Sequence, residues 1–239
     1  MKYLDKIFKN DSRPIVAYIL LAIVVFSFTM IGYAPARSFF NKFLFGFSPF
    51  VVIPILVFLG FCCLVILHLR DWFQIFTPND PKRVFPLLGL SAILPLVAII
   101  VDLTAHFPKE MNQSFPGSLA FYPSIAFVVE IVFHLIPITI LCFLFNLVIP
   151  NSKKAMVTWS ALFLVAFFEP TFQIVNMKAS SSYSSLVPIT IFINLLVFNS
   201  AQLLLFKRSG FLTMYASRLV YYLIWHVLWG YFRLGIIYR

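Results

Sequence analysis

Seven long apolar stretches alternate with short polar connectors along the chain. They cover approximately residues 15–35, 49–69, 84–104, 119–149, 156–177, 185–206 and 211–237. Each stretch is long enough to cross a hydrocarbon layer of about 30 Å as an α-helix, which requires roughly 20 residues. No segment alternates between apolar and polar residues with period two, so a β-barrel is excluded. The pattern predicts an all-α, polytopic transmembrane helix bundle of about seven spans.

The connectors carry residues that end helices. The segments "TPNDPKR" at 77–83 and "IPNSKK" at 149–154 combine proline with polar residues. The sequence contains no internal repeat and no separate soluble segment, so residues 1–239 are expected to form a single membrane domain. The stretch at 119–149 is longer than one crossing requires, and we expect it to be either tilted or broken at Pro137.

Composition and charge agree with a lipid environment. The chain is 62% hydrophobic and only 11% charged, and it contains 30 phenylalanines, too many for the core of one soluble domain. The net charge of +10 resides mostly in the connectors, as it does in proteins that face anionic headgroups, so nucleic acid is not an expected partner. The lipid bilayer is the expected surrounding, with other membrane proteins as candidate partners.

The distribution of cations predicts an orientation. Eleven Lys and Arg residues lie on the N-terminal side of a seven-span topology, and six lie on the other side. This asymmetry favours a cytoplasmic N-terminus and an external C-terminus in a plasma (inner) membrane. The first span is expected to stay uncleaved, because no small-residue cleavage site follows it.

Two predicted spans carry carboxylates at membrane depth. Glu130 and His134 share one face of the fourth span, since they are four residues apart. Glu169 and Gln173 have the same spacing in the fifth, and Pro170 frees a backbone carbonyl in the preceding turn. Ionisable side chains at this depth face the bundle interior and pair with one another, so we expect these groups to converge.

The last two spans add further polar residues. Arg218, Tyr222 and His226 lie near one stripe of the seventh span. The sixth carries three amides, which we interpret as interhelical hydrogen bonds: Asn194, Asn199 and Gln202. Asp102 lies near the end of a span and is expected to reach water, and Arg233 is expected to be an interfacial anchor.

Glu130, His134, Glu169 and His226 allow two interpretations. They form either a structural ion-pair cluster with Arg218 or a functional site. Two carboxylates and two imidazoles suit a divalent ion such as zinc, but the sequence has no dense ligand motif, so metal and cofactor remain unassigned. The cysteines lie in apolar stretches without a C-x-x-C pair, and they are interpreted as small hydrophobic residues: Cys62, Cys63 and Cys142.

The segment "VVEIVFHLIPITILCFLF" resembles the first motif of the CPBP intramembrane proteases, the type II CAAX-processing and bacteriocin-processing enzymes. That motif reads E-E-x-x-F-R, and Val129, Glu130, Phe133 and His134 fall on its four named positions. "WSALFLVAFFEPTFQ" is similar to the second motif, F-x-x-x-H, with Glu169 as the counterpart of its His. "LLLFKRSG" looks like the turn that leads into the final motif.

The final motif of that family places a His four residues before an Asn. Here "SRLVYYLIWHVLWG" supplies His226, but Gly230 occupies the Asn position. The likeness covers residues 119–235 and implies a CPBP-like core. It also implies that the first Glu activates water and that the later His and Asn support the oxyanion. Val129 stands at the first Glu and cannot accept a proton.

The resemblance leads to two functional hypotheses. The favoured one is a CPBP-like membrane protein that has lost the catalytic Glu of the family and acts as a non-catalytic or accessory subunit of a membrane complex. The alternative is a divergent intramembrane endopeptidase, with Glu130 or Glu169 as base and with His226 and Arg218 at the oxyanion. Whether the chain is an enzyme stays open. A transporter fits less well, because the first three spans have no deep charges to mirror those of the last four.

Overall fold

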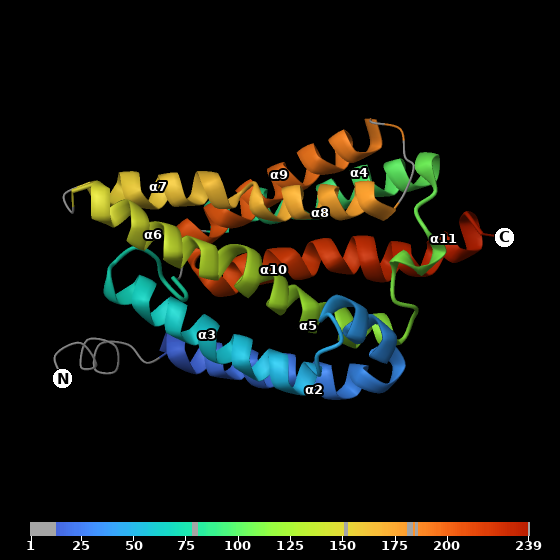
Figure 1. Ribbon diagram of the computed structural model, residues 1–239, viewed down its shortest axis with the longest axis horizontal. Coiled ribbons are helices and arrows are strands. Elements are labelled where there is room, and N and C mark those ends of the chain that lie inside the picture. Colours follow the sequence, from blue (N-terminus) through green and yellow to red (C-terminus); the bar gives the residue numbers. More distant parts are fainter. Residues whose placement is uncertain (1–12, 78–80, 151–152, 181–183, 185, 239) are drawn as a thin grey trace.

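The chain folds into an α-helical bundle, seen in the computed structural model of Figure 1. The structure describes residues 13–77, 81–150, 153–180, 184 and 186–238, and these residues form no β-strand. The long helices are α2 (Arg13–Phe43), α3 (Pro49–Leu69), α4 (Pro81–Ala105), α5 (Gly117–Val129), α6 (Ile136–Val148), α7 (Lys154–Val165), α8 (Phe168–Ser180), α9 (Leu186–Ser209) and α10 (Phe211–Tyr222). Four short segments complete the described elements: η1 (Lys109–Met111), η2 (Glu130–Leu135), η4 (Leu223–Trp229) and α11 (Gly230–Ile236).

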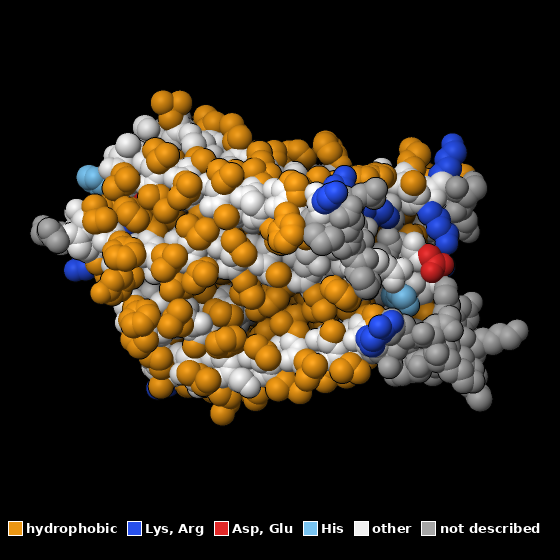
Figure 2. All heavy atoms as spheres, turned by 180° about the vertical axis from the view of Figure 1, so that it is seen from behind, with side chains coloured by type: hydrophobic (Ala, Val, Ile, Leu, Met, Phe, Trp, Pro, Cys, Tyr) orange, Lys and Arg blue, Asp and Glu red, His pale blue; other side chains and the backbone are white. Residues whose placement is uncertain are grey.

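Six helical stretches in the described residues are long and apolar enough to cross a membrane. They coincide with the first six predicted spans, so the predicted all-α polytopic bundle is confirmed. The surface agrees, because large apolar side chains point outward; Phe58 is 65% exposed and Phe163 is 67% exposed. On the face shown in Figure 2, hydrophobic side chains cover the middle of the bundle and Lys and Arg side chains lie toward its ends. Lipid is therefore the solvent of this surface.

The seventh predicted span forms the inner helix of the bundle. It consists of three consecutive segments, α10, η4 and α11, and it is not one of the six stretches with the length and hydropathy of a span. In Figure 1, α10 runs through the middle, with α2 and α3 below it and α7, α8 and α9 above it. Its polar residues Ser217 and Arg218 are almost completely buried. This inner position suits a helix with fewer apolar residues than its neighbours.

Two of the membrane helices contain π-helical segments. The stretch predicted to be tilted or broken at Pro137 is one continuous helical stretch, Gly117–Val148, and it contains the π-helix η2, which ends just before α6. Proline lacks an N–H and its ring clashes with a carbonyl one turn earlier, so the preceding turn widens. The second π-helix, η4, follows α10 without a proline. Each widened turn changes the direction in which the following side chains point.

The turn between α9 and α10 requires a glycine. Gly210 has φ +90°, a backbone conformation that other residues rarely adopt, and a Cβ atom there would lie 2.5 Å from the carbonyl oxygen of Ile75. The connector that follows α3 is tied to this turn, because Thr77 N–H donates to the Ser209 carbonyl and Leu212 N–H donates to the Ile75 carbonyl. The backbone of the connector thus closes this end of the bundle.

Replacing Gly210 by Ala should destabilise the protein by about 2–3 kcal/mol, because the new Cβ is strained and pushes the connector away. The measurement is unfolding in detergent mixtures with increasing dodecyl sulfate, followed by circular dichroism. Gly89→Ala is the matched control, since nothing lies within 4 Å of a Cβ atom at this position. Equal midpoints for the two variants would contradict the close approach at Gly210.

Candidate functional site

Arg218 lies at the centre of a buried polar cluster. Its Nε donates to Glu130 Oε1 at 2.5 Å, and its two terminal nitrogens donate to the two oxygens of Glu169 at 2.9 and 2.7 Å. The Nη2 atom also donates to Gln202 Oε1 at 2.9 Å. One guanidinium therefore links α10 to η2, α8 and α9. A planar fork of N–H groups is suited to binding two carboxylates in this way.

The remaining hydrogen bonds of the cluster involve both carboxylate oxygens of Glu130. Its Oε1 also accepts a hydrogen bond from Gln202 Nε2 at 2.7 Å, and its Oε2 lies 2.8 Å from His134 Nδ1. The other ring nitrogen of His134 lies 4.0 Å from Glu169 Oε2. The side chains of Glu130 and His134 are fully buried. The structure thus brings together four of the predicted residues, Glu130, His134, Glu169 and Arg218, in one ion-pair cluster.

Local backbone irregularities position these side chains. Glu130 and His134 both lie in the π-helix η2. Glu169 lies in the first turn of α8, directly after the break from α7, where Pro170 supplies no N–H to the preceding turn. Polar side chains at widened or broken turns are common at functional sites, because the backbone there departs from regular packing. The same local chemistry serves a structural cluster equally well.

His226 lies in a different environment from the other predicted residues. Its Nδ1 is 2.8 Å from Asn112 Oδ1, and its ring stacks on Tyr122 with centroids 4.4 Å apart. Tyr222 lies between the two regions, since its ring is beneath the Arg218 guanidinium and also contacts the His226 ring edge-on. The predicted polar group therefore does not form a single cluster. His226 lies outside the ion-pair cluster, and the Tyr222 ring lies between them.

Gly230 accounts for the position of Asn112. A Cβ atom at Gly230 would lie 3.1 Å from both Cβ and Nδ2 of Asn112. The glycine leaves room for an amide that comes from the connector before α5, and this amide contacts His226. An asparagine is thus present beside the histidine, although it is not on the same helix. Periodicity and spacing do not predict this contact, because Asn112 lies in an irregular connector.

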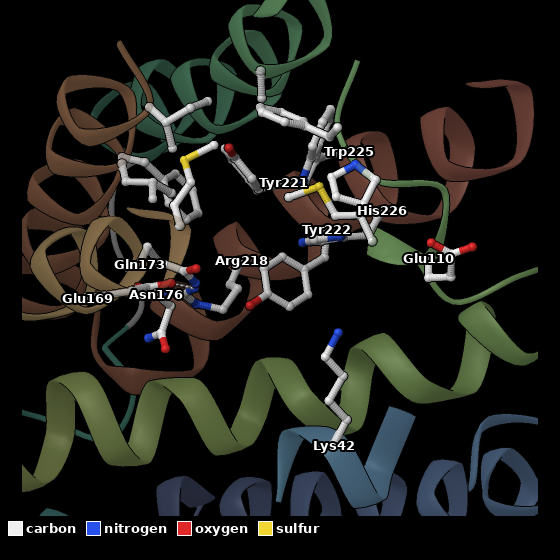
Figure 3. Close-up of a pocket in the computed structure, with 18 residues that line it drawn as sticks. Lys42, Glu110, Glu169, Gln173, Asn176, Arg218, Tyr221, Tyr222, Trp225 and His226 are labelled. Carbon is white, nitrogen blue, oxygen red and sulfur yellow. Dashed lines mark hydrogen bonds and ion pairs between the residues drawn. The ribbon is translucent and has the colours of Figure 1, made fainter. Parts of the chain in front are cut away.

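A cavity of about 560 Å³ joins the two regions, and Figure 3 shows its lining. Glu169 and Arg218 lie at one side, and Tyr222 and His226 continue the wall. Lys42 extends toward the cavity from α2 on the opposite side. This volume is in the range of small-molecule sites in proteins. The cavity therefore exposes Glu169, but not Glu130, to whatever enters it.

A second buried ion pair corrects two predictions. Asp102 and Arg233 are both fully buried, so the predictions that Asp102 reaches water and that Arg233 is an interfacial anchor are wrong. Arg233 Nε and Nη2 donate to the two Asp102 oxygens at 2.7 and 2.8 Å, and Trp229 Nε1 donates to Oδ2 at 2.7 Å. Nη2 also donates to the Phe107 carbonyl at 2.7 Å. The pair fastens α11 to the end of α4 and to the connector after it.

The described residues contain no group of three or more His, Cys, Asp or Glu side chains that could hold a metal ion. The guanidinium of Arg218 occupies the space between the two carboxylates that a cation would require. Gln202 is the member of the cluster that sequence analysis assigned only to helix packing. Gln202 Nε2 also donates to the Met214 carbonyl at 3.2 Å. This contact joins α9 to α10, and it depends on how the two helices are arranged in space.

Replacing Arg218 by Leu should destabilise the protein by about 3–5 kcal/mol, because it leaves two buried carboxylates without their counter-charge. Adding Glu130→Gln and Glu169→Gln to that variant should recover part of the loss. Denaturation with dodecyl sulfate measures both effects. Arg37→Leu, at an exposed position, is the control and should change stability by less than about 0.5 kcal/mol. An Arg218→Leu variant as stable as this control would contradict the central role of the guanidinium.

Comparison of the chain with protein-family models, with curated proteins and with solved structures gave no match. The chain is accordingly characterised by its own geometry: a polytopic membrane bundle with a buried arginine–carboxylate cluster beside a cavity.

Proposed function

We propose that this chain is a CPBP-like membrane protein without catalytic activity, which acts as an accessory subunit of a membrane complex. The observation that carries the proposal is the double engagement of Arg218, which binds both carboxylates of the candidate site. A general base must have a carboxylate oxygen within hydrogen-bond reach of the attacking water. All four oxygens of Glu130 and Glu169 already accept or share hydrogen bonds within the protein.

The surroundings of the first motif support the same proposal. Glu130 is fully buried and does not line the cavity, so a water molecule in the cavity has no direct access to it. Val129, at the position of the first Glu in the family motif, is 2% exposed and belongs to the apolar core. A substrate peptide in the cavity would therefore meet the Glu169–Arg218 ion pair and no unengaged base on η2.

A chain without chemistry of its own contributes to a membrane system through binding. The polar cluster supports this role, because it fixes four helical stretches in one arrangement and keeps the cavity in shape. We place the chain in the plasma (inner) membrane with its N-terminus in the cytoplasm, on the basis of the loop cations. In that orientation the Lys42 end of the cavity faces the outside.

The accessory role predicts that gentle extraction from the native membrane yields particles with a second protein in fixed stoichiometry. Native mass spectrometry of these particles measures composition and mass together. The stoichiometry should persist when the extract is diluted and when a second mild detergent is used. A homogeneous particle that contains only this chain would contradict the subunit role, while leaving the loss of catalysis to be tested separately.

A second candidate, a divergent intramembrane endopeptidase, is favoured by one specific observation. The cavity places Glu169 and His226 on the same wall, and Asn112 holds the His226 ring in position. In this alternative, Glu169 leaves Arg218 to activate water, and His226 and Arg218 stabilise the oxyanion.

The two candidates differ in their effect on membrane-embedded peptides. The non-catalytic proposal predicts that the purified protein in liposomes produces no new peptide termini above the level of protein-free liposomes. Mass spectrometry of a mixed set of membrane-embedded peptides detects such termini. Cleavage by the wild type that is lost in both Glu169→Gln and His226→Ala would overturn the proposal and support the endopeptidase.

A further inference from the structure

The cavity has a ligand chemistry that the proposed function does not assign. Its lining carries two cations, Lys42 and Arg218, and two carboxylates, Glu110 and Glu169. We propose that it binds the headgroup of a zwitterionic amphiphile, one that carries an amine and a phosphate. The inference stands whether or not the chain has a protein partner, because it rests on the cavity alone.

The inner end of the cavity favours a cationic group. Behind the lining residues Glu169 and Arg218 lies Glu130, so two carboxylates share one guanidinium at this end. Aromatic side chains continue the lining from this end toward His226, and ring faces attract ammonium groups. Three of them line the cavity: Tyr221, Tyr222 and Trp225. An amine beside Glu169 meets a carboxylate and lies next to this aromatic part of the lining.

The rim favours an anionic group on one side. Lys42 is exposed, and among the described residues its ammonium forms no ion pair. Figure 3 shows it reaching from α2 toward Tyr222, whereas Glu110 lies at a different side of the opening. A phosphate bound by Lys42 gains a charge-assisted hydrogen bond and stays away from the Glu110 carboxylate. The two ends of the cavity therefore prefer opposite charges.

The charges and the apolar residues of the lining restrict the class of ligand further. A ligand with a net charge would bring an uncompensated charge into a partly buried site whose lining charges cancel, and this is costly. The lining also includes apolar residues on α8 and α9 that suit a hydrocarbon portion: Met177, Ile191, Leu195 and Phe198. An amine suits the inner end, a phosphate suits Lys42, and an apolar chain suits the residues on α8 and α9. One amphiphile with these three groups matches the whole lining.

The test is native mass spectrometry of the purified full chain, titrated in a nonionic detergent with phosphatidylethanolamine and phosphatidylglycerol of identical acyl chains. The wild type should retain one phosphatidylethanolamine about tenfold more tightly than phosphatidylglycerol. Lys42→Gln should weaken that binding about tenfold, as expected for loss of one charge-assisted hydrogen bond. Lys109→Gln should leave it unchanged, because Lys109 is exposed near the same end but does not line the cavity.

A second pair of variants separates this site from lipid bound elsewhere on the surface. Gln173 is exposed and lines the cavity, so Gln173→Trp should fill it and abolish the retained lipid. Val175, on the same helix, is 63% exposed and does not line the cavity, so Val175→Trp should bind like the wild type. Retention of phosphatidylethanolamine by Gln173→Trp, or equal retention of phosphatidylglycerol by the wild type, would overturn the proposal.

Free glycerophosphoethanolamine, a phosphodiester whose phosphate and amine charges cancel, distinguishes the two sources of the headgroup chemistry. If it displaces the lipid at concentrations well below those that destabilise the protein, the cavity recognises the headgroup itself and accepts a soluble zwitterion. If it does not displace the lipid, the apolar chain contributes and a membrane lipid is the ligand. Both results support the zwitterion. Displacement of the lipid by phosphate alone, at the same concentration as by glycerophosphoethanolamine, would contradict a role for the amine.

Discussion

The arrangement of this bundle depends on one guanidinium group inside the membrane. A carboxylate at this depth is costly unless a charge of opposite sign contacts it, and Arg218 contacts two of them. Because Glu130, Glu169 and Gln202 come from three different helical stretches, their geometry around Arg218 fixes the relative positions of those helices and of α10. The apolar faces that surround the cluster supply packing, but they do not by themselves specify which helix faces which.

Irregular turns lie where the polar residues are concentrated. Glu130 opens the π-helix η2, Glu169 follows the break between α7 and α8, and His226 lies in the π-helix η4. A regular helix would send its side chains outward at a constant angle, so a widened turn allows a buried pair to meet without moving the helix axis. Proline accounts for the first two irregularities. No proline accompanies η4, in which Trp225 and Trp229 are both buried.

Much of the fold could be predicted because hydropathy and helical periodicity are local properties. Six spans and the convergence of Glu130, His134, Glu169 and Arg218 follow from spacing within single helices and from the cost of buried charge. The pairs that could not be predicted join distant segments. Asp102 and Arg233 are separated by 131 residues, and each was interpreted from its position near a span end. The partner of His226 lies in a connector without periodicity.

The two ion pairs together explain why a cavity is present at all. Arg218 and Arg233 lie on the same inner helix, 15 residues and therefore roughly 20 Å apart. The first fastens the helix near the middle of the bundle, and the second fastens it to Asp102 and to the connector that begins at Phe107. Between these two fixed points, Trp225 packs against Phe107 of the connector and His226 stacks on Tyr122 of α5. The space left over is the cavity, and its persistence follows from charges that cannot separate inside a membrane.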